Sequence, residues 1–195
     1  MSDQIKHECG IALVHLKKPL QFYQHKYGSH MYGVDKMFLM MEKQKNRGQD
    51  GAGFASLKLN LNPGDKYLHR VRSFDQQAIH SVFKKINKKI NQFIKSKKID
   101  SNSDDFYRKT PFLGQVMLGH VRYGTYGKNS IEYVHPVMRQ NNWMNRNLIL
   151  AGNFNMTNND ELFESLVKLG QHPREQSDTI TIMEKIGHFL DSEVI

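Results

Sequence analysis

Apolar and polar positions alternate along the chain in blocks that are typical of strands and helices. Residues 7–16 are continuously apolar from Ile11 to Val14, as expected of a buried strand. Residues 33–45 repeat apolar side chains at helical spacing and end before a glycine-rich turn. Because strands and helices interleave without regular βαβ spacing, the pattern predicts an α+β fold. Further strands are expected at 54–59, 66–71, 116–123 and 148–150, and further helices at 160–169 and 179–190.

A polar, lysine-rich stretch interrupts this pattern at residues 75–110, and we interpret it as an insertion within a single domain. Seven lysines lie between residues 83 and 98, on the side opposite to a stripe of apolar residues. The segment therefore predicts an amphipathic surface helix, followed by a loop at 100–105. The apolar stripe consists of Phe83, Ile86, Ile90, Phe93 and Ile94.

The formal charge of the chain is +9, with 28 Lys and Arg against 19 Asp and Glu. Such an excess would suit nucleic acid, but much of it lies on the solvated face of the helix, without an aromatic-rich RNA motif or zinc-finger spacing. No apolar run reaches the roughly 18 residues of a membrane helix, and residues 1–8 lack the apolar stretch of a signal peptide. We therefore expect a cytoplasmic protein with neither a nucleic-acid nor a membrane partner.

Cys9 is the single cysteine of the chain, which excludes an intrachain disulfide framework and a multi-cysteine metal site. A lone cysteine is either an inert core residue or a reactive thiol, so the surrounding residues must decide. We expect neither a metal nor a cofactor in this segment. Residues 47–53, 119–125, 152–158 and 177–179 carry further candidate chemistry, although each alone would be an ordinary turn, strand end or helix cap.

The order and combination of these segments resemble the class II glutamine amidotransferases. The motifs are Cys9-Gly10-Ile11, Arg-Gly-Gln-Asp-Gly-Ala-Gly, Gly-His-Val-Arg-Tyr-x-Thr, His-Pro-Val, Asn-x-Asn-x-Thr-Asn and Ser-Asp-Thr. The resemblance covers Cys9 to about Ile182, apart from residues 75–110. It implies an N-terminal-nucleophile αββα sandwich, in which two antiparallel sheets lie between helix layers. The chain would then comprise a leader, residues 1–8, and a glutaminase domain, residues 9–195.

The resemblance implies that Cys9 is the nucleophile, which attacks the side-chain amide of glutamine to give a γ-glutamyl thioester and ammonia. Its own α-amino group would act as general base, since an amine and a thiol both titrate close to neutral pH. That amine exists only after cleavage of the Glu8–Cys9 bond, so residues 1–8 resemble a propeptide. Asn153 and the backbone N–H of Phe154 would hold the oxyanion.

Charged side chains would hold the glutamine substrate. Arg122 would pair with its α-carboxylate and Asp178 with its α-ammonium group. Thr125 belongs to the same substrate-contacting segment. Arg47 and Gly48 would brace the cysteine end of the site.

The sequence departs from the family at three positions near these residues. The usual Asn-Gly-Asn loop contains Phe154 in place of glycine, which would be strained if the position required a positive φ. Gly152 stands where histidine is usual, and Gly124 where serine is common. His135 matches the histidine of the His-Pro-Val segment, and we assign it no chemical step.

We expect the glutaminase segment of an enzyme that resembles the amidophosphoribosyltransferases, which pass ammonia to phosphoribosyl pyrophosphate in purine synthesis. The leader favours this type over a glucosamine-6-phosphate synthase type, with an asparagine synthetase type third. Residues 179–195 alone follow Asp178, so we expect the acceptor domain to be absent and leave open whether the sandwich is complete at its C-terminal end. A truncated, non-catalytic regulatory module is the alternative from another class. The oligomeric state, a homo-oligomer included, is also open.

Overall fold

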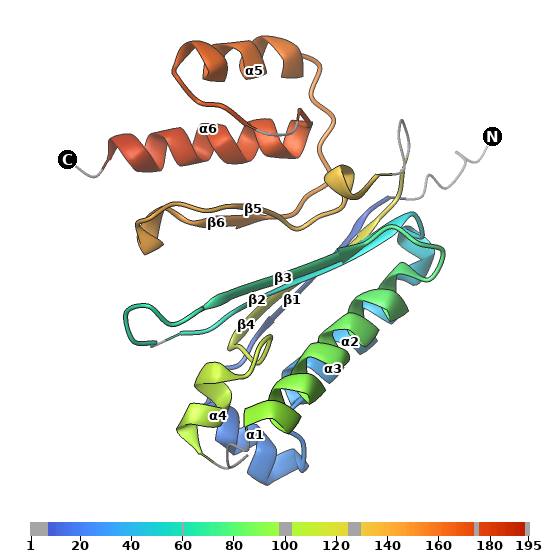
Figure 1. The fold of residues 1–195 in the computed structure, drawn as a ribbon. Coiled ribbons are helices and arrows are strands. Elements are labelled where there is room, and N and C mark those ends of the chain that lie inside the picture. The colour runs from blue at the N-terminus through green and yellow to red at the C-terminus, as the bar shows by residue number, and fades with distance from the viewer. Residues whose placement is uncertain (1–7, 60, 98–102, 125–129, 174–175, 194–195) are drawn as a thin grey trace.

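The elements of the chain stack in layers (Figure 1). The computed structural model describes residues 8–59, 61–97, 103–124, 130–173 and 176–193. Helices α2 and α3 cover one face of a four-stranded sheet, and a two-stranded sheet lies over its other face. Helix α6 covers the smaller sheet, and α5 lies outside α6. The predicted α+β class, with two antiparallel sheets between helices, is therefore confirmed.

The strands are β1 (Gly10–His15), β2 (Gly51–Leu57), β3 (Leu68–Ser73), β4 (Val116–Arg122), β5 (Val137–Arg139) and β6 (Leu148–Leu150). The α-helices are α1 (Leu20–Tyr27), α2 (Tyr32–Lys43), α3 (Ala78–Lys97), α4 (Asp104–Lys109), α5 (Asn159–Lys168) and α6 (Asp178–Ser192).

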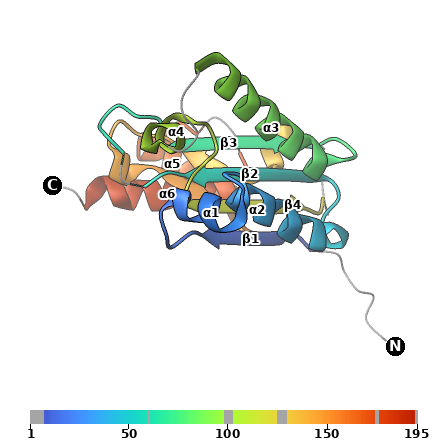
Figure 2. The same cartoon turned by 90° about the horizontal axis from the view of Figure 1, so that it is seen from below.

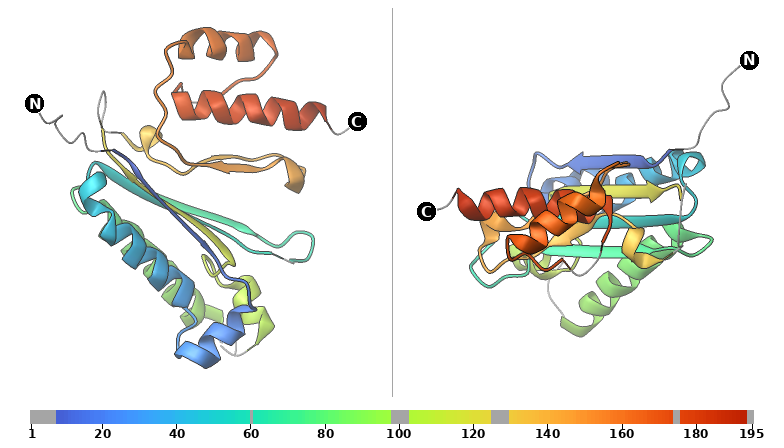
Figure 3. Two further views of the ribbon diagram at one scale, coloured as in Figure 1. Left: turned by 180° about the vertical axis from the view of Figure 1, so that it is seen from behind. Right: turned by 90° about the horizontal axis from the view of Figure 1, so that it is seen from above.

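The larger sheet separates an apolar side from a polar side. It is antiparallel, with the strand order β1-β4-β2-β3. Ala12 and Phe54 face the helices and join the main hydrophobic core, as expected where successive side chains alternate between the two faces. The register places Gly53 opposite His120 on β4 and Arg72 on β3, on the face that meets the second sheet. The views in Figures 2 and 3 show α2 and α3 on one side of this sheet, and the smaller sheet with α5 and α6 on the other.

Helix α3 confirms the predicted amphipathic pattern. Phe83, Ile86 and Ile90 are buried against the sheet, whereas the described lysines of the helix are exposed. The apolar stripe thus joins the main core, and α3 lies along β2 and β3 as part of the helix layer. Whether residues 75–110 are an insertion relative to other proteins stays a prediction.

Helix α6 is fixed to the second sheet by an apolar cluster and a buried ion pair. Val137 of β5 packs against Ile180 and Met183 of α6. Arg139, with a side chain only 9% exposed, binds Asp191 at 2.6 Å and Glu184 at 3.0 Å. A Cβ atom at Gly187 would lie 2.4 Å from Nε of Arg139, so the helix needs glycine where the guanidinium crosses it. These contacts hold the first turn of α6 in place.

The sequence pattern did not predict α1, α4 or β5. The loop predicted at 100–105 is wrong at its end, because α4 begins at Asp104, where the Ser103 side chain accepts a hydrogen bond from the N–H of Phe106. Strand β5 is only three residues long, which is too short for a period to be recognised.

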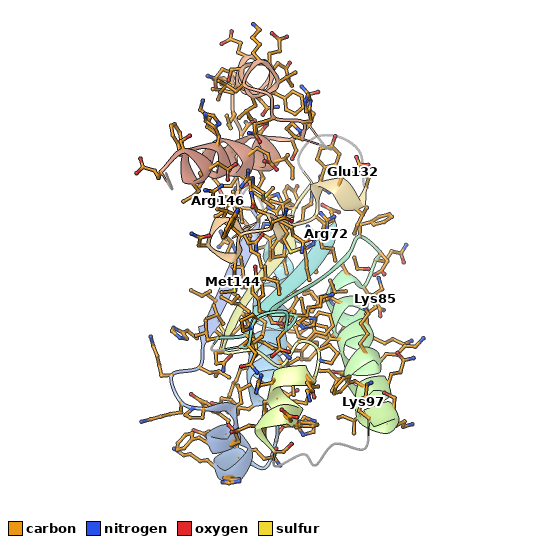
Figure 4. The ribbon with its side chains drawn as sticks, turned by 60° about the vertical axis from the view of Figure 1, so that its left-hand side comes forward. Arg72, Lys85, Lys97, Glu132, Met144 and Arg146 are labelled. Carbon is orange, nitrogen blue, oxygen red and sulfur yellow. The ribbon has the colours of Figure 1, made fainter. Side chains whose placement is uncertain are left out.

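Arg72 links β3 to the segment before β5 by donating to the carbonyl oxygen of Val134 at 2.8 Å. Figure 4 shows Arg72 reaching from β3 toward that segment.

Candidate active site

The segments that carry candidate chemistry converge on a cavity of about 630 Å³. Its walls come from the start of β1, the end of β4, the segment after β6 and the start of α6. The predicted site residues that line it are Cys9, Arg122, Asn153, Phe154 and Asp178. Residues more than 160 positions apart in the sequence therefore share one hollow, although their chemical roles stay predictions.

Cys9 lies directly before β1, where the strand pairing brings it beside the end of β4. Gly10 is opposite Val121 in the register, so the chain after Arg122 passes next to the thiol. The Sγ atom accepts a hydrogen bond from the N–H of Tyr123 at 3.4 Å. The thiol in turn donates to the carbonyl oxygen of Tyr123 at 3.9 Å, so both hydrogen bonds tie Cys9 to the chain after β4. The thiol is partly exposed and faces the cavity rather than the core.

The glycine-rich segment before β2 braces the end of β4. A Cβ atom at Gly48 would lie 2.6 Å from the carbonyl carbon of Arg122, so only glycine allows this approach. The N–H of Asp50 donates to the carbonyl oxygen of Arg122 at 3.0 Å, and its Oδ2 accepts from the N–H of Gly124 at 2.7 Å. The sequence analysis did not assign a role to Asp50. The one feature that could have indicated it is a polar residue placed between glycines. Arg47 points outward, and its exposed guanidinium binds Glu8 at 3.5 Å.

Arg122 is a buried cation that faces the cavity without a counter-ion. The residue is 7% exposed, and its Nη1 has no hydrogen-bond partner among the residues that the structure describes. Within the same residues, no carboxylate lies within ion-pair distance of its guanidinium. The carbon at its centre is 5.7 Å from the centroid of the Tyr133 ring, a cation–π contact. A buried charge without a partner is costly, and such a group is typical of a site that receives an anion.

Asp178 ties the first turn of α6 to the loop after β6. Ser177 caps this helix by accepting a hydrogen bond from the N–H of Ile180 at 3.3 Å. The Oδ2 atom of Asp178 accepts from the N–H of Met156 at 2.8 Å. Within the described part of the chain, Oδ1 has no hydrogen-bond partner. One carboxylate oxygen is thus used for structure, and the other is available to a ligand in the cavity.

Phe154 does not have a positive φ, so the condition under which it would be strained is not met. Of the non-glycine residues described, Phe112 alone has a positive φ. The two departures from the family at 152 and 154 fit together, because a Cβ atom at Gly152 would lie 2.2 Å from Cε2 of Phe154. The aromatic ring therefore lies where a side chain at position 152 would begin. Neither the Asn153 side chain nor the N–H of Phe154 bonds to another residue in the described ranges.

Two histidines, His120 and His135, lie next to this loop. The sequence analysis gave neither a role. The rings of His120 and His135 are 4.6 Å apart between their centroids. The pKa of His120 is lowered to about 3 and that of His135 to about 4, mainly by burial and in smaller part by the charge of Arg122. The N–H of Gly152 donates to Nδ1 of His135 at 3.4 Å, so the proton of this neutral ring belongs on Nε2.

Part of this chain is similar in sequence to a known enzyme. A curated amidophosphoribosyltransferase from Lacticaseibacillus casei is 35% identical over 77 residues, which cover 40% of this chain and 39% of that protein. This chain contains a domain like that of the class II glutamine amidotransferases. It spans about two fifths of the length of that relative. No family model matches the chain.

A solved structure described as the allosteric regulatory enzyme of purine biosynthesis resembles the amidotransferase-like domain, with a TM-score of 0.44 and 20% identity. The match covers 93% of this chain and 33% of the other. Thr125 lies outside the described residues. In the ranges that are described, no group of three or more His, Cys, Asp and Glu side chains could hold a metal ion, and no helix is long and apolar enough to cross a membrane.

Proposed function

We propose that this amidotransferase-like domain hydrolyses glutamine to glutamate and ammonia, as the glutaminase part of an amidophosphoribosyltransferase-type enzyme. The observation that carries the proposal is the shared cavity, which brings together a partly exposed thiol, a buried arginine and a carboxylate. Among the described residues, Nη1 of that arginine and one oxygen of that carboxylate have no hydrogen-bond partner. An α-amino acid offers the complementary pair of charges. The match to an amidophosphoribosyltransferase supports this subtype over the glucosamine-6-phosphate synthase type.

In this proposal Arg122 receives the α-carboxylate of glutamine. A guanidinium can donate two parallel hydrogen bonds to a carboxylate, and a buried one is already desolvated. Asp178 receives the α-ammonium group through Oδ1, while Oδ2 keeps its bond to Met156. The two charges fix the direction of the substrate, so that its side-chain amide extends toward Cys9.

The chemistry begins when Sγ of Cys9 attacks the carbonyl carbon of the side-chain amide. The thiol proton passes to the α-amino group of Cys9, and the carbonyl oxygen becomes an oxyanion. Asn153 and the N–H of Phe154 donate hydrogen bonds to that oxygen. When the C–N bond breaks, the α-ammonium group returns a proton to the leaving nitrogen, which departs as ammonia. Water then adds to the thioester, and Sγ leaves to release glutamate.

The leader prevents this reaction while it is attached. The nitrogen of Cys9 is then an amide nitrogen, which cannot accept the thiol proton. Glu8 also lines the cavity, so this residue occupies part of the space beside the thiol. The ammonia that is released would go to phosphoribosyl pyrophosphate, which would bind outside this domain.

The test compares two chains with different first residues. A chain that begins Met-Cys9, from which methionine is removed, should release glutamate from glutamine. The chain that retains Met1–Glu8 should be slower by roughly the 10²- to 10⁴-fold that a general base contributes. Mass spectrometry confirms each N-terminus, and Cys9→Ser serves as the inactive control. Equal rates with and without the leader would exclude an N-terminal nucleophile.

A further inference from the structure

A second cavity, of about 550 Å³, lies between β3, α3 and the segment that follows α4. It shares no lining residue with the cavity at Cys9. Its volume is in the range of roughly 300–1,000 Å³ that small-molecule sites occupy. The proposed glutaminase reaction makes no use of it.

Positive charge dominates the rim of this second cavity. Five cationic side chains line it against one carboxylate, that of Asp65. Arg108 is engaged with Asp65 at 2.9 Å, and Lys109 with Asp105 at 2.7 Å. Lys66 and Lys89 have no carboxylate within ion-pair distance in the described part of the chain. The rim therefore carries charge that no acidic side chain offsets.

The floor of the cavity is aromatic and contains the one strained non-glycine residue that the structure describes. Phe112 has φ of 64° and is only 2% exposed. Its ring lies 5.2 Å from that of His69, and Nζ of Lys89 stands 5.7 Å from its centroid. A positive φ at a phenylalanine costs about 1–3 kcal/mol and is common where a backbone is held for a ligand. The buried ring packs beneath Nζ of Lys89 at the wall of the cavity.

Lys58 and His69 are two further groups next to the rim of this cavity. Lys58 is buried, and its Nζ donates to the carbonyl oxygens of Arg108 and Thr110, both at 2.6 Å. These bonds hold the backbone that carries Arg108 and Lys109 at the rim. The pKa of His69 is lowered to about 4, mainly by burial and in smaller part by the charges of Lys58, Lys66 and Lys89. The Nε2 atom of His69 is buried and has no hydrogen-bond partner in the described ranges.

We infer that this second cavity binds a small phosphate-bearing anion. Lys66 and Lys89 would neutralise its phosphate oxygens. The bound anion would favour protonation of His69, which would then donate a hydrogen bond from Nε2, and Phe112 would pack beneath Lys89. The hollow shape and aromatic floor favour a small molecule over a nucleic acid, which would instead follow the outward lysines of α3. The inference is independent of the proposed glutaminase reaction.

Calorimetric titration of the full chain with inorganic pyrophosphate tests this inference. Lys66→Gln/Lys89→Gln should weaken binding at least tenfold. The matched control, Lys84→Gln/Lys88→Gln, removes the same charge from exposed positions of α3 and should change affinity less than twofold. Equal weakening in both variants, or no binding to the unmodified chain, would overturn the inference.

A second readout distinguishes a built site from diffuse attraction. Saturating pyrophosphate should raise the pKa of His69, measured by NMR, because a bound anion favours the protonated ring. An unchanged His69 pKa at saturation contradicts the site. Titration with a single-stranded oligonucleotide tests the rival ligand, since both carry phosphate. Tighter binding of the oligonucleotide that is lost in the Lys84/Lys88 variant would assign the charge to nucleic acid instead.

Discussion

Arg122→Met should stabilise the fold and weaken the binding of glutamine. The substitution keeps an unbranched side chain in the buried position but removes the charge. An unsatisfied buried donor costs about 1–3 kcal/mol, and the cation–π contact with Tyr133 returns about 0.5–1 kcal/mol. The free energy of unfolding should therefore rise by about 1–2 kcal/mol. Loss of the pair with the α-carboxylate should cost about 1.5–3 kcal/mol, or roughly 10- to 100-fold in affinity.

Urea unfolding and calorimetric binding of glutamine measure the two effects. A Cys9→Ala background prevents turnover during the titration. Arg72→Met is the matched control, because Arg72 belongs to the same sheet but lies outside the cavity and donates to the carbonyl oxygen of Val134. That variant should lose about 1–2 kcal/mol of stability and keep its glutamine affinity within twofold. The assignment of Arg122 fails if Arg122→Met destabilises the protein while glutamine affinity is unchanged.

Two further predictions concern the support of the loop at Asn153. His135 has its pKa lowered to about 4 by burial, so below pH 6.5 the unfolded chain binds a proton that the folded chain does not. His135 alone should therefore lower the free energy of unfolding by about 2 kcal/mol between pH 7 and pH 5. This contribution should be absent in His135→Asn. Gly152→Ala should displace the ring of Phe154 and lower kcat/KM for glutamine by roughly 10- to 100-fold, since small displacements of a catalytic loop have effects of this order.

Each of these predictions has its own control. The lowered pKa values of Asp65, Asp105 and Asp191 place the corresponding carboxylate losses below about pH 4. Burial raises the pKa of Asp35, but this carboxylate is common to both chains, so the difference between them at pH 5 reports His135. An identical pH dependence in His135→Asn contradicts the first prediction. For the second, Phe154→Ala added to Gly152→Ala should restore activity by removing the clash. Activity that stays low in the double variant would show that the ring is not the cause.

The sequence alone determined much of the layout. Apolar periodicity predicted strands near β1, β2, β3, β4 and β6 and helices near α2, α3, α5 and α6, because burial of one face leaves a local repeat in the chain. The resemblance to class II amidotransferases also named residues that do share a cavity. Short or capped elements such as α4 and β5 were missed, since three to six residues are too few to show a period.

Only the tertiary structure decided which distant residues meet. The register of β1 with β4 places Tyr123 at the thiol of Cys9, and that register depends on hydrogen bonds between strands more than 100 residues apart. The sequence does not distinguish Gly48 from other loop glycines, whereas the structure places the carbonyl group of Arg122 directly beside it. Gly152 and Phe154 read as two separate departures, yet in space they compensate each other. Such pairings depend on shape and non-local contact, which a one-dimensional pattern of apolar and polar positions does not contain.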